Sequence, residues 1–215
     1  MLPRIAAAFV SFGLLTAPAL AGSFASAPPQ DPPAAMPMPP IDVELPPVEV
    51  APTKAEVLKA LKARRAKNLK SFTAYRKGGV YPHNTVRRGP LNVWLDSDGH
   101  LCAAATMMDK DGKHELVYEV ARTNNYQRLM DVTEGPLLDW IMTSGFTIEE
   151  IDQIQAPMIE PDYVIDYSLQ DQRLAEGYAR TEKALVKKQK ASLELAAKRL
   201  LENPHLARQL VDGKV

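Results

Sequence analysis

Apolar residues recur at helical spacing in the segment after residue 53. Four of them share one stripe: Leu58, Leu61, Leu69 and Phe72. Arg65 interrupts this stripe. Thr53 and Glu56 have the spacing of a capping box, in which the hydroxyl accepts from the amide of Glu56 and the carboxylate accepts from the amide of Thr53. The pattern predicts a helix from Thr53 to about Tyr75, ending before Gly78 and packed along one side.

Three segments with strand character follow, separated by Asp-Gly steps. The segments are residues 91–95, 101–107 and 115–121, and the steps lie at 98–99 and 111–112. Asp-Gly between apolar runs favours a hairpin because glycine adopts positive φ at little cost. The sequence therefore predicts a small three-stranded antiparallel meander packed with helices, which is an α+β fold. A register shift of one residue would exchange the two faces of this sheet.

The sequence GPLLDWIMTSGFTIEEIDQIQ at residues 135–155 predicts two helices joined by a tight turn. Pro136 suits the first turn of a helix, and Gly145 suits the left-handed position just past its end. Thr147 and Glu150 have the spacing of a second capping box, which would start the next helix.

The C-terminal segment is rich in helix-forming residues from about Leu169 to Glu202. Its apolar stripe is broken by VKKQK at residues 186–190, and Pro204 is expected to end or kink the helix at Asn203. We predict a long basic helix within residues 168–215 that projects from the domain. A protein partner or a second copy of the chain would then cover its apolar side, and removal of residues 171–215 would leave a folded core.

Residues 1–21 have the pattern of a secretory signal peptide. Arg4 precedes an apolar run from Ile5 to Leu15, and Ala-Leu-Ala at 19–21 offers a cleavage site after Ala21. We therefore expect an exported protein, periplasmic or extracellular. No later segment is apolar over the length that a bilayer requires, so no transmembrane segment is expected after cleavage.

A proline-rich segment follows the predicted cleavage site. Residues 27–52 contain ten of the eighteen prolines and no Lys or Arg. This composition favours extended polyproline conformations over a packed core. We predict four parts: a signal peptide at 1–21, a disordered tether at 22–52, an α+β domain at 53–167 and the C-terminal helix at 168–215.

Charge is balanced overall but segregated along the chain. Nine Lys or Arg and one acid occupy residues 54–77, whereas residues 131–172 hold ten acids and no Lys or Arg. Internal pairing between the basic helices and the acidic middle is one explanation. The alternative is a surface on the helix at 54–77 that binds an anionic envelope polymer or a lipid surface. The candidate residues for that surface are Lys62, Arg64, Arg65, Lys67 and Lys70.

Cys102 is the only cysteine, so an intramolecular disulfide is impossible. A thiol enzyme would need a histidine beside the sulfur, and His100 and His83 are the candidates. His114 would lie too far away across the predicted hairpin. The simpler interpretations are a small hydrophobic residue on a strand or an intermolecular disulfide.

The two Asp-x-Asp-Gly tetrads, at 96–99 and 109–112, do not fit a calcium-binding EF-hand. With Gly99 or Gly112 at the sixth position, the first ligand would be Trp94 or Met107. A single cysteine and the absence of His-x-x-x-His spacing argue against zinc, and phosphate-binding Gly-rich motifs are absent. We expect no metal and no cofactor. Export and the lack of interleaved aromatic residues argue against nucleic-acid binding.

Together these patterns predict an exported, noncatalytic binding or assembly protein of the cell envelope or secreted space. One alternative is a small hydrolase or thiol enzyme that uses Cys102. Another is an anionic-surface binder that uses the basic helix at 54–77.

Overall fold

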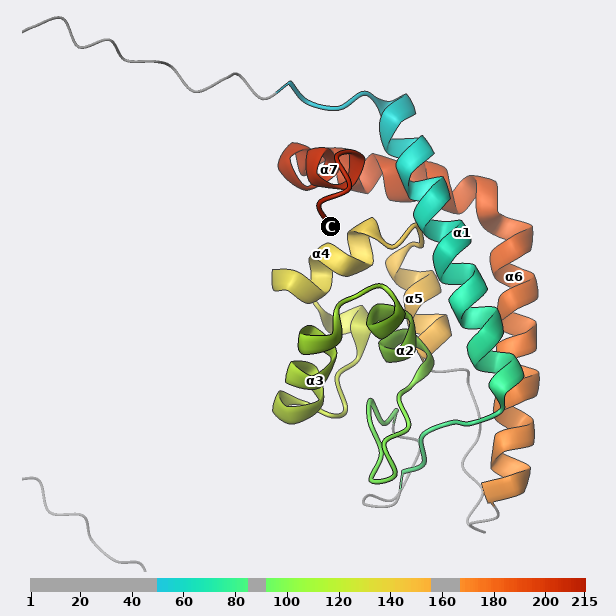
Figure 1. The fold of residues 1–215 in the computed structure, drawn as a ribbon. Coiled ribbons are helices and arrows are strands. Elements are labelled where there is room, and N and C mark those ends of the chain that lie inside the picture. Colours follow the sequence, from blue (N-terminus) through green and yellow to red (C-terminus); the bar gives the residue numbers. More distant parts are fainter. Residues whose placement is uncertain (1–49, 85–91, 156–166) are drawn as a thin grey trace, which may run out of the picture. The chain divides into compact units, whose positions relative to one another are not determined.

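A computed structural model describes residues 50–84, 92–155 and 167–215. These residues belong to one compact unit, Val48–Val215. The predicted signal peptide and nearly all of the predicted tether lie outside the described residues. The described part forms seven α-helices and one short 3-10 helix (Figure 1): α1 Lys54–Gly78, α2 Ala103–Lys110, α3 His114–Thr123, η1 Leu129–Asp131, α4 Gly135–Thr143, α5 Ile148–Gln155, α6 Tyr167–Leu201 and α7 Pro204–Val211.

The prediction of an α+β fold is wrong, because the described residues form an all-α structure. The only β pairing among them is an isolated antiparallel bridge between Leu95 and Leu101. The predicted second strand runs into α2 and the third lies within α3. No three-stranded meander therefore exists in the described part of the chain.

The buried residues of α2 and α3 follow a helical period, which explains why these segments are not strands. Cys102 caps α2, and its Sγ accepts from the amide of Ala105 at 3.5 Å. Alanine is the strongest helix former, and residues 103–105 are all alanine. In α3 the buried residues Val117 and Val120 lie three apart, while Tyr118, which a strand would place beside Val120, is exposed.

Both Asp-Gly steps form turns, as predicted, but the second joins helices instead of strands. Gly99 has φ 87° and Gly112 has φ 85°. The first step closes a tight loop in which the amide of Asp96 donates to the carbonyl of His100 at 3.0 Å. The second connects α2 to α3, so a turn signal alone did not identify the elements on either side of it.

The predicted N-terminal helix is confirmed. The amide of Thr53 donates to the carboxylate of Glu56 at 2.7 Å, and the amide of Glu56 donates to the Thr53 hydroxyl at 3.3 Å. At the other end of α1, Gly79 adopts the left-handed conformation with φ 67°. The helix is three residues longer than predicted, because it ends at Gly78 instead of about Tyr75.

The predicted helix pair is also confirmed as α4 and α5. Pro136 lies in the first turn of α4, and Gly145 has φ 86° just after that helix. The amide of Thr147 donates to the Glu150 carboxylate at 3.1 Å, and the amide of Glu150 donates to the Thr147 hydroxyl at 3.3 Å. The turn between the helices is buried, so it also belongs to the core.

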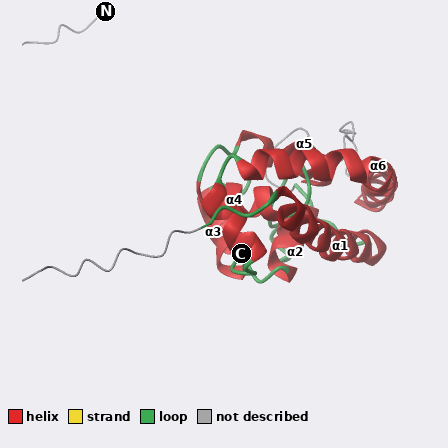
Figure 2. Cartoon of the chain, turned by 90° about the horizontal axis from the view of Figure 1, so that it is seen from above, coloured by secondary structure: helices red, strands yellow, loops and turns green. Residues whose placement is uncertain are grey.

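The C-terminal segment forms the predicted long helix α6, but that helix does not project from the unit. Tyr178 and Leu185 of α6 lie in the main core around Trp94. Leu200 of α6 lies in a second core with Leu61 of α1. Figures 1 and 2 show α1 and α6 side by side, on the side of the unit away from α3. After α6 ends at Leu201, a further short helix, α7, begins at Pro204.

Candidate functional site

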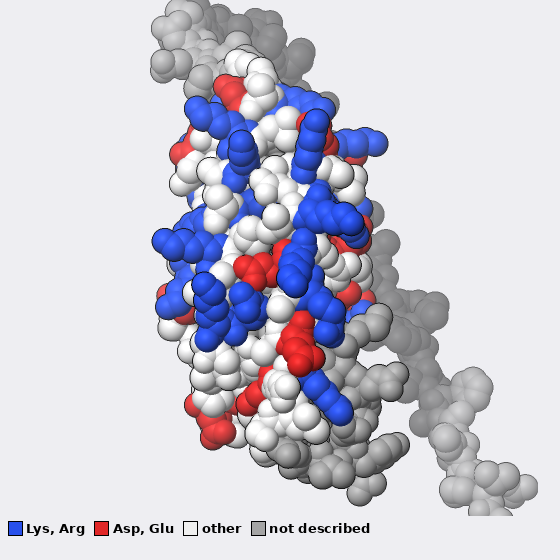
Figure 3. Space-filling view, turned by 90° about the vertical axis from the view of Figure 1, so that its right-hand side faces the viewer, with Lys and Arg blue, Asp and Glu red and all other residues white. Residues whose placement is uncertain are grey.

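Seven exposed lysines on neighbouring helices form what we call the lysine face. They are Lys59, Lys62, Lys70 and Lys77 of α1, and Lys183, Lys187 and Lys190 of α6. On α1 the spacings of three, eight and seven residues keep all four lysines on one side of a helix with 3.6 residues per turn. Figure 3 shows this side of the unit, where Lys and Arg outnumber Asp and Glu.

The other basic residues of α1 are paired with carboxylates. Lys54 pairs with Glu194 at 2.8 Å, and Arg76 pairs with Glu182 at 2.7 Å. These two pairs show that α1 and α6 run antiparallel, because the start of α1 meets the later part of α6. Three further residues of α1 pair with carboxylates outside α6: Arg64, Arg65 and Lys67. For the seven lysines of the face, by contrast, no ion pair occurs within the described ranges.

Arg65 is buried and faces the core instead of a partner. Its side chain is 1% exposed, and its Nη1 and Nη2 atoms donate to the carboxylate of Glu150 at 2.7 and 2.8 Å. The same guanidinium donates to the carbonyls of Gly145 at 3.0 Å and Leu185 at 2.8 Å. The hydroxyl of Ser192 donates to Glu150 at 2.7 Å, which completes the network. Arg65 therefore joins α1 to the α4–α5 turn and to α6.

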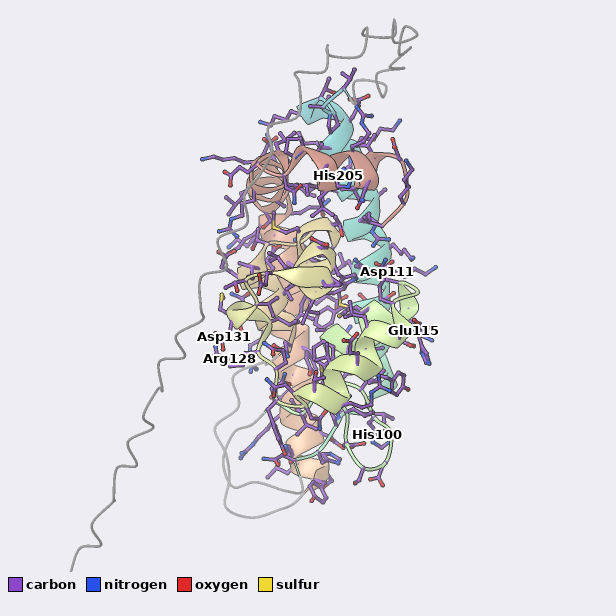
Figure 4. The ribbon with its side chains drawn as sticks, turned by 90° about the vertical axis from the view of Figure 1, so that its left-hand side faces the viewer. His100, Asp111, Glu115, Arg128, Asp131 and His205 are labelled. Atoms are coloured by element: carbon purple, nitrogen blue, oxygen red, sulfur yellow. The ribbon has the colours of Figure 1, made fainter. Side chains whose placement is uncertain are left out.

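Arg64 and Lys67 are held by Asp111, the third residue of the second Asp-x-Asp-Gly tetrad. Asp111 has no exposed side-chain surface, and both of its carboxylate oxygens accept from the guanidinium of Arg64. Lys67 donates to the same carboxylate at 2.7 Å, and the indole of Trp140 donates to it at 3.1 Å. Figure 4 shows Asp111 at the α2–α3 turn, with Glu115 on α3 beside it. This aspartate therefore ties α1 to the end of α2 and to α4.

A groove of about 550 Å³ lies between α1 and α6. Its apolar lining comes from α1, through Ala66, Leu69 and Ala74. Further lining comes from the polar residues Thr73, Gln189, Lys70, Lys77 and the buried Arg65. The lining of the groove therefore combines apolar and basic side chains.

A carboxylate near this groove, that of Glu182, is already neutralised. The hydroxyl of Thr73 donates to it, and Nε of Arg76 donates to it at 2.7 Å. The two acids on the outer side of α6 lie beyond the lysines, since Glu176 is seven residues before Lys183 and Glu194 is four residues after Lys190. The charge available at the groove is thus positive.

The loop at the first Asp-x-Asp-Gly tetrad brings three metal-ligating residue types together. One ligand atom from each of Asp96, Asp98 and His100 lies within 4.8 Å of the others. The Asp96 carboxylate, however, already accepts from the amides of His100 at 2.7 Å, Asp98 at 3.0 Å and His83 at 3.2 Å. Burial opposes ionisation of Asp96, but these amides and the ring of His100 outweigh it and lower the pKa of that carboxyl. The arrangement is explained by the turn itself.

Cys102 is buried at the start of α2, where no imidazole contacts it. Burial raises the pKa of its thiol to about 12, so the nucleophilic thiolate is disfavoured. The ring of His100 bonds to Asp96 at 3.0 Å, and the ring of His83 bonds to Asp171 at 2.8 Å. The geometry gives the thiol-enzyme alternative no support.

Comparison with protein-family models, with curated proteins and with solved structures finds no match. Among the described helices, none has the length and apolar character needed to cross a membrane. The function is therefore inferred from the surface of this chain alone.

Sequence reasoning found part of the lysine face. Of its five candidate residues, Lys62 and Lys70 are exposed and lie on the face, whereas the other three form the ion pairs described above. It missed five members of the face: Lys59, Lys77, Lys183, Lys187 and Lys190. The spacing on α1 was readable from the sequence, but the contribution of α6 was not, because only the packing places α6 beside α1.

Proposed function

We propose that the chain is an exported, noncatalytic binding protein whose lysine face holds an anionic partner. The observation that carries this proposal is the division of the basic residues of α1. Five of them are used in ion pairs, and the remaining four lysines share one exposed side with three more from α6.

The physical reason is that charges of one sign on a single face add their fields. Seven ammonium groups gathered on two adjacent helices repel one another in the folded state, and a bound anion relieves that repulsion. Such a surface also speeds the encounter with an anionic partner. Scattered or paired lysines would have neither effect.

The proposal is tested with the mature chain, residues 22–215, and fluorescently labelled inorganic polyphosphate as the anionic probe. The double variant Lys70→Glu/Lys77→Glu should bind the probe about tenfold more weakly, or more weakly still, because each attraction becomes a repulsion. Affinity of the unaltered chain should fall as salt rises. Fluorescence anisotropy at two salt concentrations measures both effects.

The matched control is Arg122→Glu/Arg128→Glu, which makes the same change in net charge outside the lysine face. Figure 4 shows Arg128 on the opposite side of the unit. The control should bind polyphosphate like the unaltered chain. Equal losses in the two double variants, or binding that salt does not weaken, would contradict a localised anion-binding face.

A further inference from the structure

We infer that the groove between α1 and α6 binds an acidic helical segment of a partner protein, held by the lysines of α1 that line it. This inference rests on the proposed function, since the same lysines supply the charge. It adds that the partner is a polypeptide with apolar side chains, and that the groove is where those side chains bind.

Each of the two helices carries a row of lysines, and the row on α1 lines the groove through Lys70 and Lys77. Lys70 and Lys77 on α1 are seven residues apart, and so are Lys183 and Lys190 on α6. Seven residues are two helical turns, or about 10 Å.

The spacing of the lysines along each helix favours a helical partner. Carboxylates two turns apart on an acidic helix, at positions i and i+7, match the separation of the lysines in each row. The row on α1 from Lys59 to Lys77 covers eighteen residues, or about 27 Å, so a helical segment of about eighteen residues would span it. Helix-in-groove binding of this kind is a common mode of peptide recognition.

The groove lining favours a polypeptide over a simple polyanion. Ala66, Leu69 and Ala74 present methyl and isobutyl groups between the lysines. Phosphate chains have no apolar groups to bury there, whereas Leu or Ala side chains of an acidic helix do.

The same lining disfavours a lipid surface. Helices that lie on membranes present a broad face of Trp, Phe and Leu. On the described groove, the residues between the lysines are small or half-buried, and they lie in a concave position. A flat bilayer cannot reach into such a groove without losing its contact with the surrounding lysines.

The test separates groove binding from charge alone by filling the groove without changing charge. Ala66 is exposed and lines the groove, so Ala66→Trp should block it. Ala55 is exposed on the same helix but precedes Lys59 and does not line the groove, so Ala55→Trp is the matched control. The probes are a labelled eighteen-residue helical peptide with Glu two turns apart beside an Ala and Leu stripe, a scrambled peptide of the same composition, and labelled polyphosphate.

The patterned peptide should bind more tightly than the scrambled one. Ala66→Trp should weaken binding of the patterned peptide about tenfold or more, while Ala55→Trp leaves it unchanged. Polyphosphate binding should survive Ala66→Trp and be weakened about tenfold or more in Lys70→Glu/Lys77→Glu. If the patterned and scrambled peptides bind equally, or Ala66→Trp does not weaken the patterned one, the groove inference fails. If the charge-reversed variant also binds polyphosphate normally, the proposed function fails with it.

A parallel measurement uses vesicles containing one quarter phosphatidylglycerol. Vesicle binding that Ala66→Trp leaves unchanged, together with no binding of the patterned peptide, would overturn the inference in favour of a membrane surface. Vesicle binding weaker than that of the patterned peptide supports it.

Discussion

At the scale of single residues, the turn between α4 and α5 depends on Arg65 and Gly145 together. Arg65 reaches Glu150 and the carbonyls of Gly145 and Leu185 because α1 approaches the turn closely. A Cβ atom on Gly145 would lie 2.5 Å from the backbone nitrogen of Arg65 and 2.5 Å from the carbonyl oxygen of Leu61. Gly145 is therefore required by both its positive φ and the space that α1 occupies.

We predict that Gly145→Ala destabilises the protein more than Gly99→Ala does. The two glycines have nearly the same φ, +86° at Gly145 and +87° at Gly99, but a Cβ on Gly99 would meet no atom within 4 Å. The left-handed backbone alone costs about 1–2 kcal/mol for alanine, and this is the expected loss at Gly99. At Gly145 the contact with backbone atoms should raise the loss to about 3 kcal/mol or more. Urea unfolding of the two variants measures the difference, and equal losses would show that α1 can move away.

At the scale of elements, ion pairs join helices that are distant in the sequence. Glu149 in the first turn of α5 accepts from the guanidinium of Arg199 in the last turn of α6, at 2.7 and 3.1 Å. Hydrogen bonding from Arg199 lowers the pKa of Glu149 from 4.5 to about 2, although burial opposes the shift. Because the Glu149 side chain is 47% exposed, solvent screens this pair, and its contribution to stability is below about 1 kcal/mol.

The pH dependence of this pair has a definite sign. The pKa of Glu149 is lower in the folded protein, so the stabilisation is present above pH 4.5 and is lost as pH falls towards 2. Nuclear magnetic resonance titration of the Glu149 carboxyl should show the low pKa in the unaltered chain and a return towards 4.5 in Arg199→Gln. A titration that is the same in both proteins would show that the pair does not form in solution.

At the scale of the whole unit, the charge segregation seen in the sequence has two outcomes. Part of it is internal pairing, as in Arg65 with Glu150 and Arg199 with Glu149. The remainder is the lysine face, whose members have no carboxylate partner in the parts of the chain that the structure describes. Internal pairing, one of the two explanations that the sequence offered, therefore applies to some basic residues of these helices, and the proposed anion-binding surface uses others.

We predict that a chain ending at residue 166 does not fold cooperatively. It lacks α6, and with it Tyr178 and Leu185 of the main core. A chain ending at residue 203 lacks only α7, which buries Leu206 and Leu210 in the second core, and should fold with reduced stability. Thermal melting followed by circular dichroism compares the two truncations. A sharp transition in the shorter chain would restore the view that α6 is a separate segment.

The sequence by itself determined the features that depend on local hydrogen bonds. The capping boxes at Thr53 and Thr147, and the positive φ of Gly99 and Gly145, are settled within a few residues of the chain, so their patterns were sufficient. The tertiary structure decided whether short apolar segments form helices or strands, which the periodicity of apolar residues left ambiguous. Residues 103–110 are helical, with Met107 and Met108 both buried against neighbouring helices, which a strand with one solvent-facing side would not allow.

The candidate site was likewise predictable in part from the sequence and in part only from the fold. The sequence contained the lysine spacing on α1. Which basic side chains of α1 form ion pairs, however, depends on carboxylates far away in the chain, such as those of Asp111 and Glu150. Only the packing of α1 against α2, α5 and α6 places those carboxylates. Ion pairs between distant residues follow from the fold and leave no local pattern, and this is why Arg65 was expected at the surface and lies in the core.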